Sequence, residues 1–222
     1  MGSGTVSKEI EVQSAYWDKE ASAFHAIYSH EKSEVSNLLD RVFRKDMYER
    51  FAFTMEHGAP CDGRSFLDVG CGSGLYSVEF AKRGSNRVVG IDIANDMLTL
   101  SRELAIREHV ESQCSFIHSD LLEFESESPF DVCIGIGLFD YIRDPLPVLK
   151  RMREMTKGKV VVSFPRVWTW RAPIRKVRLA LRRCAVFFYR RGRIEGLMHL
   201  AGFTRVDIHV VGKLYCVVGY VE

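Results

Sequence analysis

The chain has 222 residues, of which 46% are hydrophobic and 27% are charged, and its formal net charge is +2. This length is enough for one α/β domain with a substantial core, and this composition excludes a disordered chain, a collagen-like chain and a disulfide-stapled scaffold. The six cysteines form neither a CxxC pair nor a Cys/His cluster, which argues against a bound metal and favours a reducing compartment.

The N-terminal part of the chain predicts helices. We expect residues 1–11 to form a disordered tail and residues 12–222 to form one domain, with a helical lid at 12–60 and a core at 64–222. Val35, Leu38 and Leu39 recur at helical spacing, and Gly58 and Pro60 then break the pattern. No apolar run approaches the roughly 20 residues of a membrane-spanning helix, so we expect a cytoplasmic protein.

Strands and helices alternate through the rest of the chain, which indicates an α/β fold with a parallel sheet. The last two expected strands are joined by Gly212 and Lys213, and so close a pair must be antiparallel. The expected strands are 65–69, 87–93, 115–118, 130–137, 159–164, 205–211 and 214–221, and the expected helices are 75–83, 96–108, 145–156 and 173–183.

The most informative motif is a glycine-rich turn between the first expected strand and the helix after it. Gly70, Gly72 and Gly74 alternate there, and Asp68 precedes them on the strand. Glycine lets the backbone turn sharply and lets a ligand lie against it. The spacing departs from G-x-G-x-x-G, because Leu75 occupies the third position, and an acidic residue would repel a pyrophosphate. The turn therefore argues against a nucleotide-dependent oxidoreductase and favours a ligand that carries an ammonium group.

Two further carboxylates end the next two expected strands. Asp92 closes the second strand and Asp120 closes the third. Strand ends of a parallel sheet open onto the ligand crevice, so Asp92 can accept the hydroxyl groups of a ribose and Asp120 the amine of an adenine. The alternative is that Asp68 caps the turn and that Asp92 caps the helix that follows.

Together these features resemble the class I S-adenosylmethionine-dependent methyltransferases. The resemblance implies an α/β, Rossmann-like fold with a mostly parallel seven-stranded sheet, an antiparallel C-terminal strand and an N-terminal helical lid. It covers residues 65–222 and implies S-adenosylmethionine as cofactor and S-adenosylhomocysteine (SAH) as product. The cofactor contacts that it implies are Tyr16, Asp68, Gly70, Gly72, Gly74, Asp92, Ile93, Met97, Asp120, Leu121, Ile136 and Gly137.

Shorter stretches are similar to the magnesium-protoporphyrin methyltransferase group. They are residues 27–29, residues 34–35 and Ser163-Phe164-Pro165 before an Arg-rich segment. A dicarboxylate acceptor would explain the arginines, as would many other acidic metabolites.

Residues after the fourth expected strand should face the reaction. Asp140 is a candidate proton acceptor and Tyr141 a candidate for lining the acceptor pocket, although Asp140 can equally cap a helix. Tyr28 is a candidate substrate contact, and His25 a candidate base whose alternative is a packed or solvated histidine.

One segment is strongly basic. Ten Lys/Arg residues and no Asp or Glu lie from Arg166 to Arg193, so the rest of the chain carries 21 basic and 29 acidic residues. Three interpretations remain open for this segment. It is a solvated helix, a clamp for an acidic acceptor through Arg166, Arg171 or Arg175, or a peripheral contact with a membrane surface or nucleic acid. Nucleic acid is disfavoured because the chain as a whole is not strongly basic.

We expect methyl transfer to an oxygen or nitrogen of a small molecule, an acidic one included. The alternatives are a methyltransferase acting on RNA or protein and a non-catalytic module that binds S-adenosylmethionine. An N-P-P-Y type signature is absent after the fourth expected strand, which weakens the RNA or protein alternative. The sequence gives no indication of the oligomeric state.

Overall fold

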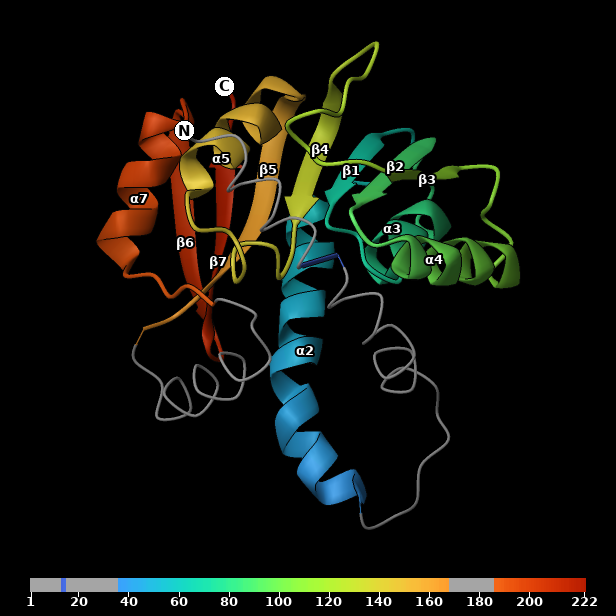
Figure 1. Ribbon diagram of the computed structural model, residues 1–222, viewed down its shortest axis with the longest axis horizontal. Coiled ribbons are helices and arrows are strands. Elements are labelled where there is room, and N and C mark those ends of the chain that lie inside the picture. The colour runs from blue at the N-terminus through green and yellow to red at the C-terminus, as the bar shows by residue number, and fades with distance from the viewer. Residues whose placement is uncertain (1–12, 15–35, 168–185) are drawn as a thin grey trace.

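A computed structural model describes residues 13–14, 36–167 and 186–222 of the chain. The described chain forms a seven-stranded sheet with helices on both faces (Figure 1). Its strands are β1 (Ser65–Val69), β2 (Arg87–Asp92), β3 (Cys114–His118), β4 (Phe130–Gly135), β5 (Thr156–Pro165), β6 (Arg205–Val211) and β7 (Leu214–Tyr220).

The order of the strands has a switch point beside β1, where the chain changes direction across the sheet. The order is β3-β2-β1-β4-β5-β7-β6, and the pairs from β3 through to β5 are parallel. The chain moves outward from β1 to β2 and β3 on one side, then returns to β4 on the other side of β1. A ligand crevice opens at such a switch point, beyond the carboxyl ends of the strands.

The antiparallel expectation for the C-terminal strands is confirmed. β7 pairs antiparallel with both β5 and β6, so it is the reversed strand of the sheet. The mostly parallel seven-stranded sheet inferred from the sequence is therefore the observed one.

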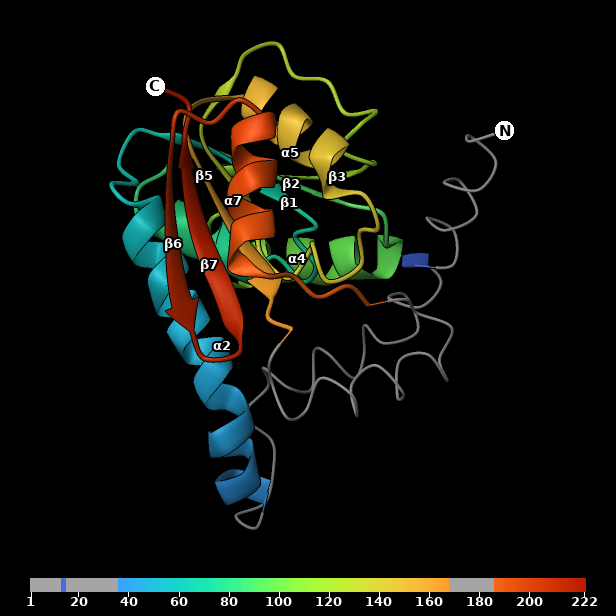
Figure 2. The same ribbon diagram turned by 90° about the vertical axis from the view of Figure 1, so that its left-hand side faces the viewer.

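The helices complete the layers. They are α2 (Ser36–Gly58), α3 (Leu75–Lys82), α4 (Asn95–Arg107), α5 (Pro145–Glu154) and α7 (Arg191–Leu200). Figure 2 shows α2 and α7 on opposite sides of the part of the sheet that contains β5, β6 and β7. The N-terminal half of α2 projects beyond the edge of the sheet at which β4 ends (Figure 1).

Alternation along the strands produces two cores. Phe66 packs with residues of α3 and α4 on one face, whereas Leu67 and Val69 pack with residues of α5 and α7 on the other. On β4, Cys133 belongs to the core on the α5 side, and the residues before and after it belong to the core on the α3 side. Successive side chains of a strand point to opposite faces, and because both faces are covered the strands are apolar throughout.

Expected and observed element ends agree within three residues for the strands and for the described helices after residue 60. β5 begins earlier than expected because Thr156 pairs with Phe130 on β4 and its hydroxyl donates to the Met152 carbonyl, 2.6 Å away. β4 ends earlier because Gly137 has a φ of 81°, which an extended strand does not allow.

Helix α7 is not expected from the sequence. It buries only Ile194 and Met198 and contains Gly192 and Gly196, so its apolar periodicity is short and its helix propensity weak. The expected helix 173–183 lies outside the described residues. Within the ranges that the structure does describe, no helix combines the length and apolarity needed to cross a bilayer.

Candidate functional site

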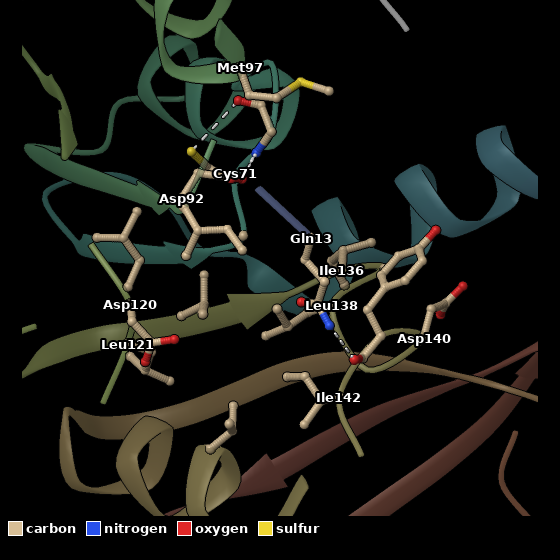
Figure 3. A pocket seen from close by; sticks show the side chains of 18 of the residues that line it. Gln13, Cys71, Asp92, Met97, Asp120, Leu121, Ile136, Leu138, Asp140 and Ile142 are labelled. Atoms are coloured by element: carbon tan, nitrogen blue, oxygen red, sulfur yellow. Dashed lines mark hydrogen bonds between the residues drawn. The ribbon is translucent and has the colours of Figure 1, made fainter. Parts of the chain in front are cut away.

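A cavity of about 570 Å³ lies at the carboxyl ends of β1, β2 and β4. Figure 3 shows Asp92, Asp120 and Asp140 at three separate places around it. The described lining also includes Gln13, Arg50, Gly70, Cys71, Gly72, Ile93, Met97, Leu121, Ile136, Gly137, Leu138, Tyr141, Ile142 and Arg143. This volume falls in the range of sites for small molecules and cofactors.

The glycine turn forms one wall of the cavity. The amides of Gly70 and Cys71 both donate to the carbonyl of Ile91 on β2, at 2.8 and 3.1 Å, so the turn is folded back against the neighbouring strand. Gly70 and Gly72 have φ values of 67° and 53°, a region that favours glycine. Among the described residues, a Cβ added at Gly72 would meet no atom within 4 Å, so this backbone faces open space where a ligand can lie against it.

Asp92 is held by the backbone on both carboxylate oxygens. Oδ2 accepts a hydrogen bond from the Gly72 amide at 2.8 Å, and Oδ1 accepts one from the Ala94 amide at 2.9 Å. The carboxylate thus links the end of β2 to the glycine turn and to the start of α4. Each carboxylate oxygen has more than one lone pair, so a fixed Asp92 can also accept from a hydroxyl group in the cavity.

Asp120 caps a turn and also lines the cavity. Its Oδ1 accepts from the Leu122 amide at 2.7 Å, which caps the turn after β3. Asp120 and Leu121 also line the cavity, on a different side from Asp92 (Figure 3).

The structure does not bring Asp68 and Gly74 to the described cavity wall. Asp68 is buried on the α3 side of β1, where its Oδ2 accepts from the Ser77 hydroxyl at 2.6 Å. Burial raises the pKa of Asp68 to about 7, against the lowering effect of this hydrogen bond. Gly74 serves helix packing, because a Cβ there would lie 2.7 Å from that of Ser101 on α4.

The segment after β4 contributes a further carboxylate, that of Asp140, and a kink at Gly137. Gly137 has a positive φ, and its amide donates to the Ser163 hydroxyl of β5 at 2.9 Å. Asp140 is only 5% exposed and lines the cavity, while its backbone carbonyl accepts from the Phe187 amide at 2.8 Å. Tyr141 also lines the cavity, and its carbonyl accepts from the Gln13 side chain at 2.9 Å.

Arg50 is a lining residue that the sequence reasoning missed. It extends from α2 to the cavity beside Gly137, where its Nη1 lies 3.5 Å from the position that a Cβ would occupy. Its Nε donates to the hydroxyl of Tyr76 on α3 at 3.2 Å. In the structure Phe53 and Thr54 follow at i+3 and i+4 and are buried, which puts Arg50 on the packed side of its helix.

The described part of the basic segment does not reach the cavity. Arg166 donates from Nη1 to the Gly212 carbonyl at 3.1 Å and packs over the Tyr215 ring, so it belongs to the β6–β7 hairpin. The described lining contains four Asp and two Arg residues, which does not favour an acidic acceptor over a neutral one. Tyr16, His25, Tyr28, Arg171 and Arg175 lie outside the described residues.

Comparison with known proteins supplies a family and a set of relatives. The sequence profile of the methyltransferase domain family matches residues 61–185. The chain is 29% identical over 117 residues to the ubiquinone biosynthesis O-methyltransferase of Aliivibrio fischeri (strain MJ11), a match that covers 52% of this chain and 49% of the relative. It is 33% identical over 105 residues to the protein of that name from Neisseria meningitidis (serogroup A, strain Z2491), covering 46% and 43%. The chain thus matches about half the length of these curated relatives.

Solved structures resemble nearly the whole chain. The magnesium protoporphyrin IX methyltransferase of Synechocystis PCC 6803 with bound SAH superposes with a TM-score of 0.74 at 17% identity, covering 96% of this chain and 98% of that one. The same enzyme with bound SAM gives a TM-score of 0.71 at 15% identity, with 96% of both chains covered. Likeness at this level of identity establishes a shared fold.

Proposed function

The chain belongs to the methyltransferase domain family, within the class I S-adenosylmethionine-dependent methyltransferases, and on that premise we propose that it transfers a methyl group to an oxygen of a small molecule. The observation that carries the proposal is the cavity itself, where the glycine turn, Asp92 and Asp120 meet at adjoining strand ends. The choice of oxygen is supported by the curated relatives, which are O-methyltransferases by name.

The cavity suits the cofactor in three places. Asp92 would accept from the ribose hydroxyl groups, since its carboxylate is already oriented by two backbone amides. Leu121 and Ile93 would pack against the adenine, and Asp120 would lie at its edge. The open backbone at Gly72 leaves room for the sulfur-bearing chain to pass.

Arg50 would hold the carboxylate at the amino-acid end of the cofactor. A guanidinium group forms strong, charge-assisted hydrogen bonds with a carboxylate. Arg50 lies beside Tyr76 and beside Gly137, which follows β4, whereas Asp120 and Leu121 follow β3 on the other side of β1 in the sheet. Its bond to the Tyr76 hydroxyl would fix the guanidinium before the ligand arrives.

Methyl transfer would take place beside the segment after β4. Bound S-adenosylmethionine supplies an electrophilic methyl group on a sulfonium, so the protein has mainly to align an attacking oxygen with it and to exclude water. Tyr141 and Ile142 would line the acceptor side of the cavity. Asp140, a buried carboxylate that lines the cavity, would take the proton of an acceptor that arrives as a hydroxyl.

Calorimetric titration with SAH tests the cofactor assignment. We expect the wild type to bind and Asp92→Ala to bind roughly 10- to 150-fold more weakly, since a hydrogen bond to a charged group contributes about 1.5–3 kcal/mol. The matched control is Asp96→Ala, the same substitution at an exposed residue of α4 outside the cavity. Thermal melting of both variants comes first, because Asp92 also holds two backbone amides.

Wild-type protein that is folded and fails to bind SAH would contradict the proposal, as would equal affinities for wild type and Asp92→Ala. Transfer of a labelled methyl group from S-adenosylmethionine to a panel of phenols and other hydroxyl compounds then tests the reaction. Labelling of RNA or protein instead would assign the chain to a macromolecular acceptor.

A further inference from the structure

The loop that follows β4 is held by a stretch of chain that is distant in sequence. The Phe187 amide donates to the Asp140 carbonyl at 2.8 Å, and the Tyr189 hydroxyl donates to the Ile142 carbonyl at 3.0 Å. The two bonds lie on either side of Tyr141, which lines the cavity together with Asp140 and Ile142. Both bonds are made to backbone carbonyls, so they fix the course of the loop without using its side chains.

Tyr189 is itself fixed to the sheet. Its amide donates to the carbonyl of Pro165 at the end of β5, at 2.8 Å, and its carbonyl accepts from the Val167 amide at 3.3 Å. Its ring packs edge-on against that of Phe164 on β5, with centroids 5.0 Å apart, and the Phe164 ring stacks in turn on that of Phe139 at 4.5 Å. Tyr189 therefore links the end of β5 to the loop after β4.

Packing alone does not account for the hydroxyl of Tyr189. The residue is 1% exposed and belongs to the apolar core on the α5 side, where a phenylalanine would fill nearly the same space. A buried hydroxyl needs a hydrogen-bond partner, and here the partner is the Ile142 carbonyl. Burial raises the pKa of Tyr189 to about 12, so the hydroxyl stays protonated and remains a donor near neutral pH.

We propose that Tyr189 is a positioning residue for the methyl acceptor. By holding the loop 139–142, it places Asp140 and Tyr141 against the oxygen that receives the methyl group. The inference rests on the proposed function, in which Asp140 takes the proton of the acceptor. Tyr189 is not among the described residues that line the cavity, so its effect reaches the reaction through the loop. Methyl transfer depends on alignment, and a displacement of about 1 Å can lower a rate about 100-fold.

A positioning role predicts that the reaction suffers while cofactor binding does not. Tyr189→Phe keeps the ring and removes the hydroxyl. We expect transfer of a methyl group from S-adenosylmethionine to a phenol, with catechol as the first probe, to slow about 10- to 100-fold at saturating concentrations. Affinity for SAH should change less than about 2-fold, because Asp92 and the glycine turn are held by other bonds. The matched control is Tyr48→Phe, the same substitution at an exposed residue of α2 outside the described lining.

A double-mutant cycle separates positioning from a general loosening of the fold. If Tyr189 acts through Asp140, its hydroxyl should matter little once the carboxylate is gone. Tyr189→Phe should therefore slow methyl transfer less than about 2-fold in protein that already carries Asp140→Asn. A residue that only stabilises the fold would slow both backgrounds by the same factor.

Amide hydrogen exchange tests the same link without an acceptor. The Tyr141 amide donates to the Leu138 carbonyl at 3.1 Å, and the Phe187 amide donates to Asp140. Loss of the Tyr189 hydroxyl should let the loop open more often, so both amides should exchange about 2- to 12-fold faster in Tyr189→Phe, the effect of one neutral hydrogen bond. Amides within β1 should keep their wild-type rates.

Unchanged exchange at Tyr141 and Phe187 would overturn the proposal, as would equal slowing by Tyr189→Phe with and without the Asp140 carboxylate. A loss of SAH affinity as large as the loss of rate would also overturn it, because Tyr189 would then support the whole cavity. Failure of the proposed function looks different: wild-type protein would bind no SAH or would methylate no hydroxyl compound, whatever the variants do.

Discussion

The hydroxyl of Ser77 on α3 donates a hydrogen bond of 2.6 Å to the buried carboxylate of Asp68 on β1. Asp68 is 2% exposed and lies on the same face of β1 as Phe66, beneath α3. The residue therefore ties a helix to the central strand, two positions before the glycine turn. Its burial, with the nearby charge of Asp92 adding to the effect, raises the pKa of Asp68 from 3.8 to about 7.

This pKa predicts how stability depends on pH. Because the folded protein holds the Asp68 proton more tightly than the unfolded chain does, its contribution is complete below about pH 4 and is lost as the pH rises to about 7. The loss is up to about 4 kcal/mol, at 1.36 kcal/mol for each pKa unit. Asp68→Asn stays neutral and keeps an oxygen for Ser77, so the variant should become more stable relative to wild type across this range.

Urea unfolding of both proteins at pH 4, 5.5 and 7.5 measures the difference. Ser77→Ala removes a hydrogen bond that lowers the pKa of Asp68, so its own loss of stability should continue to higher pH than that of wild type. Parallel stability curves for wild type and Asp68→Asn would show that Asp68 ionises at the same pH in the folded and unfolded protein.

The sequence predicts those parts of the site that depend on local order along the chain. Asp92 and Asp120 end apolar runs, and parallel strand ends share one edge of the sheet, so their position follows from strand assignment alone. Asp68, which the glycine motif also made a candidate cofactor contact, is not among the described residues that line the cavity. Alternation along β1 puts Asp68 on the face of Phe66, and that face is covered by α3.

Arg50 and Gln13 could not be placed in this way. They reach the cavity only because α2 and residues 13–14 pack against loops distant in sequence, at Gly137 and at Ile93 and Tyr141. Neither belongs to a motif with fixed spacing, and a polar residue on or near a helix is ordinarily a solvated one. For Arg166 the sequence suggested a functional role, because a basic run can bind an anion. In the structure its side chain instead packs against the β6–β7 hairpin.

Gly74 and Gly72 should respond differently to the same substitution. Both have positive φ values, 77° and 53°, which cost an alanine about 1–2 kcal/mol. Only Gly74 is also crowded, with Ser101 Cβ at 2.7 Å and its Cα at 3.1 Å, and such overpacking costs about 1–3 kcal/mol more. Gly74→Ala should therefore lose about 2–5 kcal/mol in urea unfolding, and Gly72→Ala about 1–2 kcal/mol with weaker SAH binding. Equal losses would show that α3 and α4 can separate at Gly74 at little cost.

Ser65 and Asp131 should matter for stability and not for binding. The Ser65 amide and hydroxyl both donate to Asp131 Oδ2 at 2.8 Å, and the Asp131 amide donates back to the Ser65 hydroxyl at 3.1 Å. The pair joins the amino ends of β1 and β4, at the edge of the sheet opposite the cavity. Ser65→Ala should lower the free energy of unfolding by about 1–3 kcal/mol, because it leaves part-buried polar groups unpaired. SAH titration of the variant should give wild-type affinity, and a clear loss of affinity would mean that the two edges of the sheet are coupled.

The role proposed for Arg50 predicts that its loss weakens the binding of one ligand and not of another that differs from it at one end. SAH carries an amino-acid carboxylate, and 5′-methylthioadenosine shares its adenosine but lacks that group. Arg50→Met should weaken SAH roughly 10- to 150-fold, the expected effect of losing a charged hydrogen bond, and change the affinity for methylthioadenosine less than about 2-fold. Arg50→Lys keeps the charge without the planar fork and should fall between wild type and Arg50→Met for SAH. Because Arg50 also donates to Tyr76, melting temperatures are compared first. Equal weakening of both ligands would place the effect of Arg50 on the shape of the cavity instead of on the carboxylate.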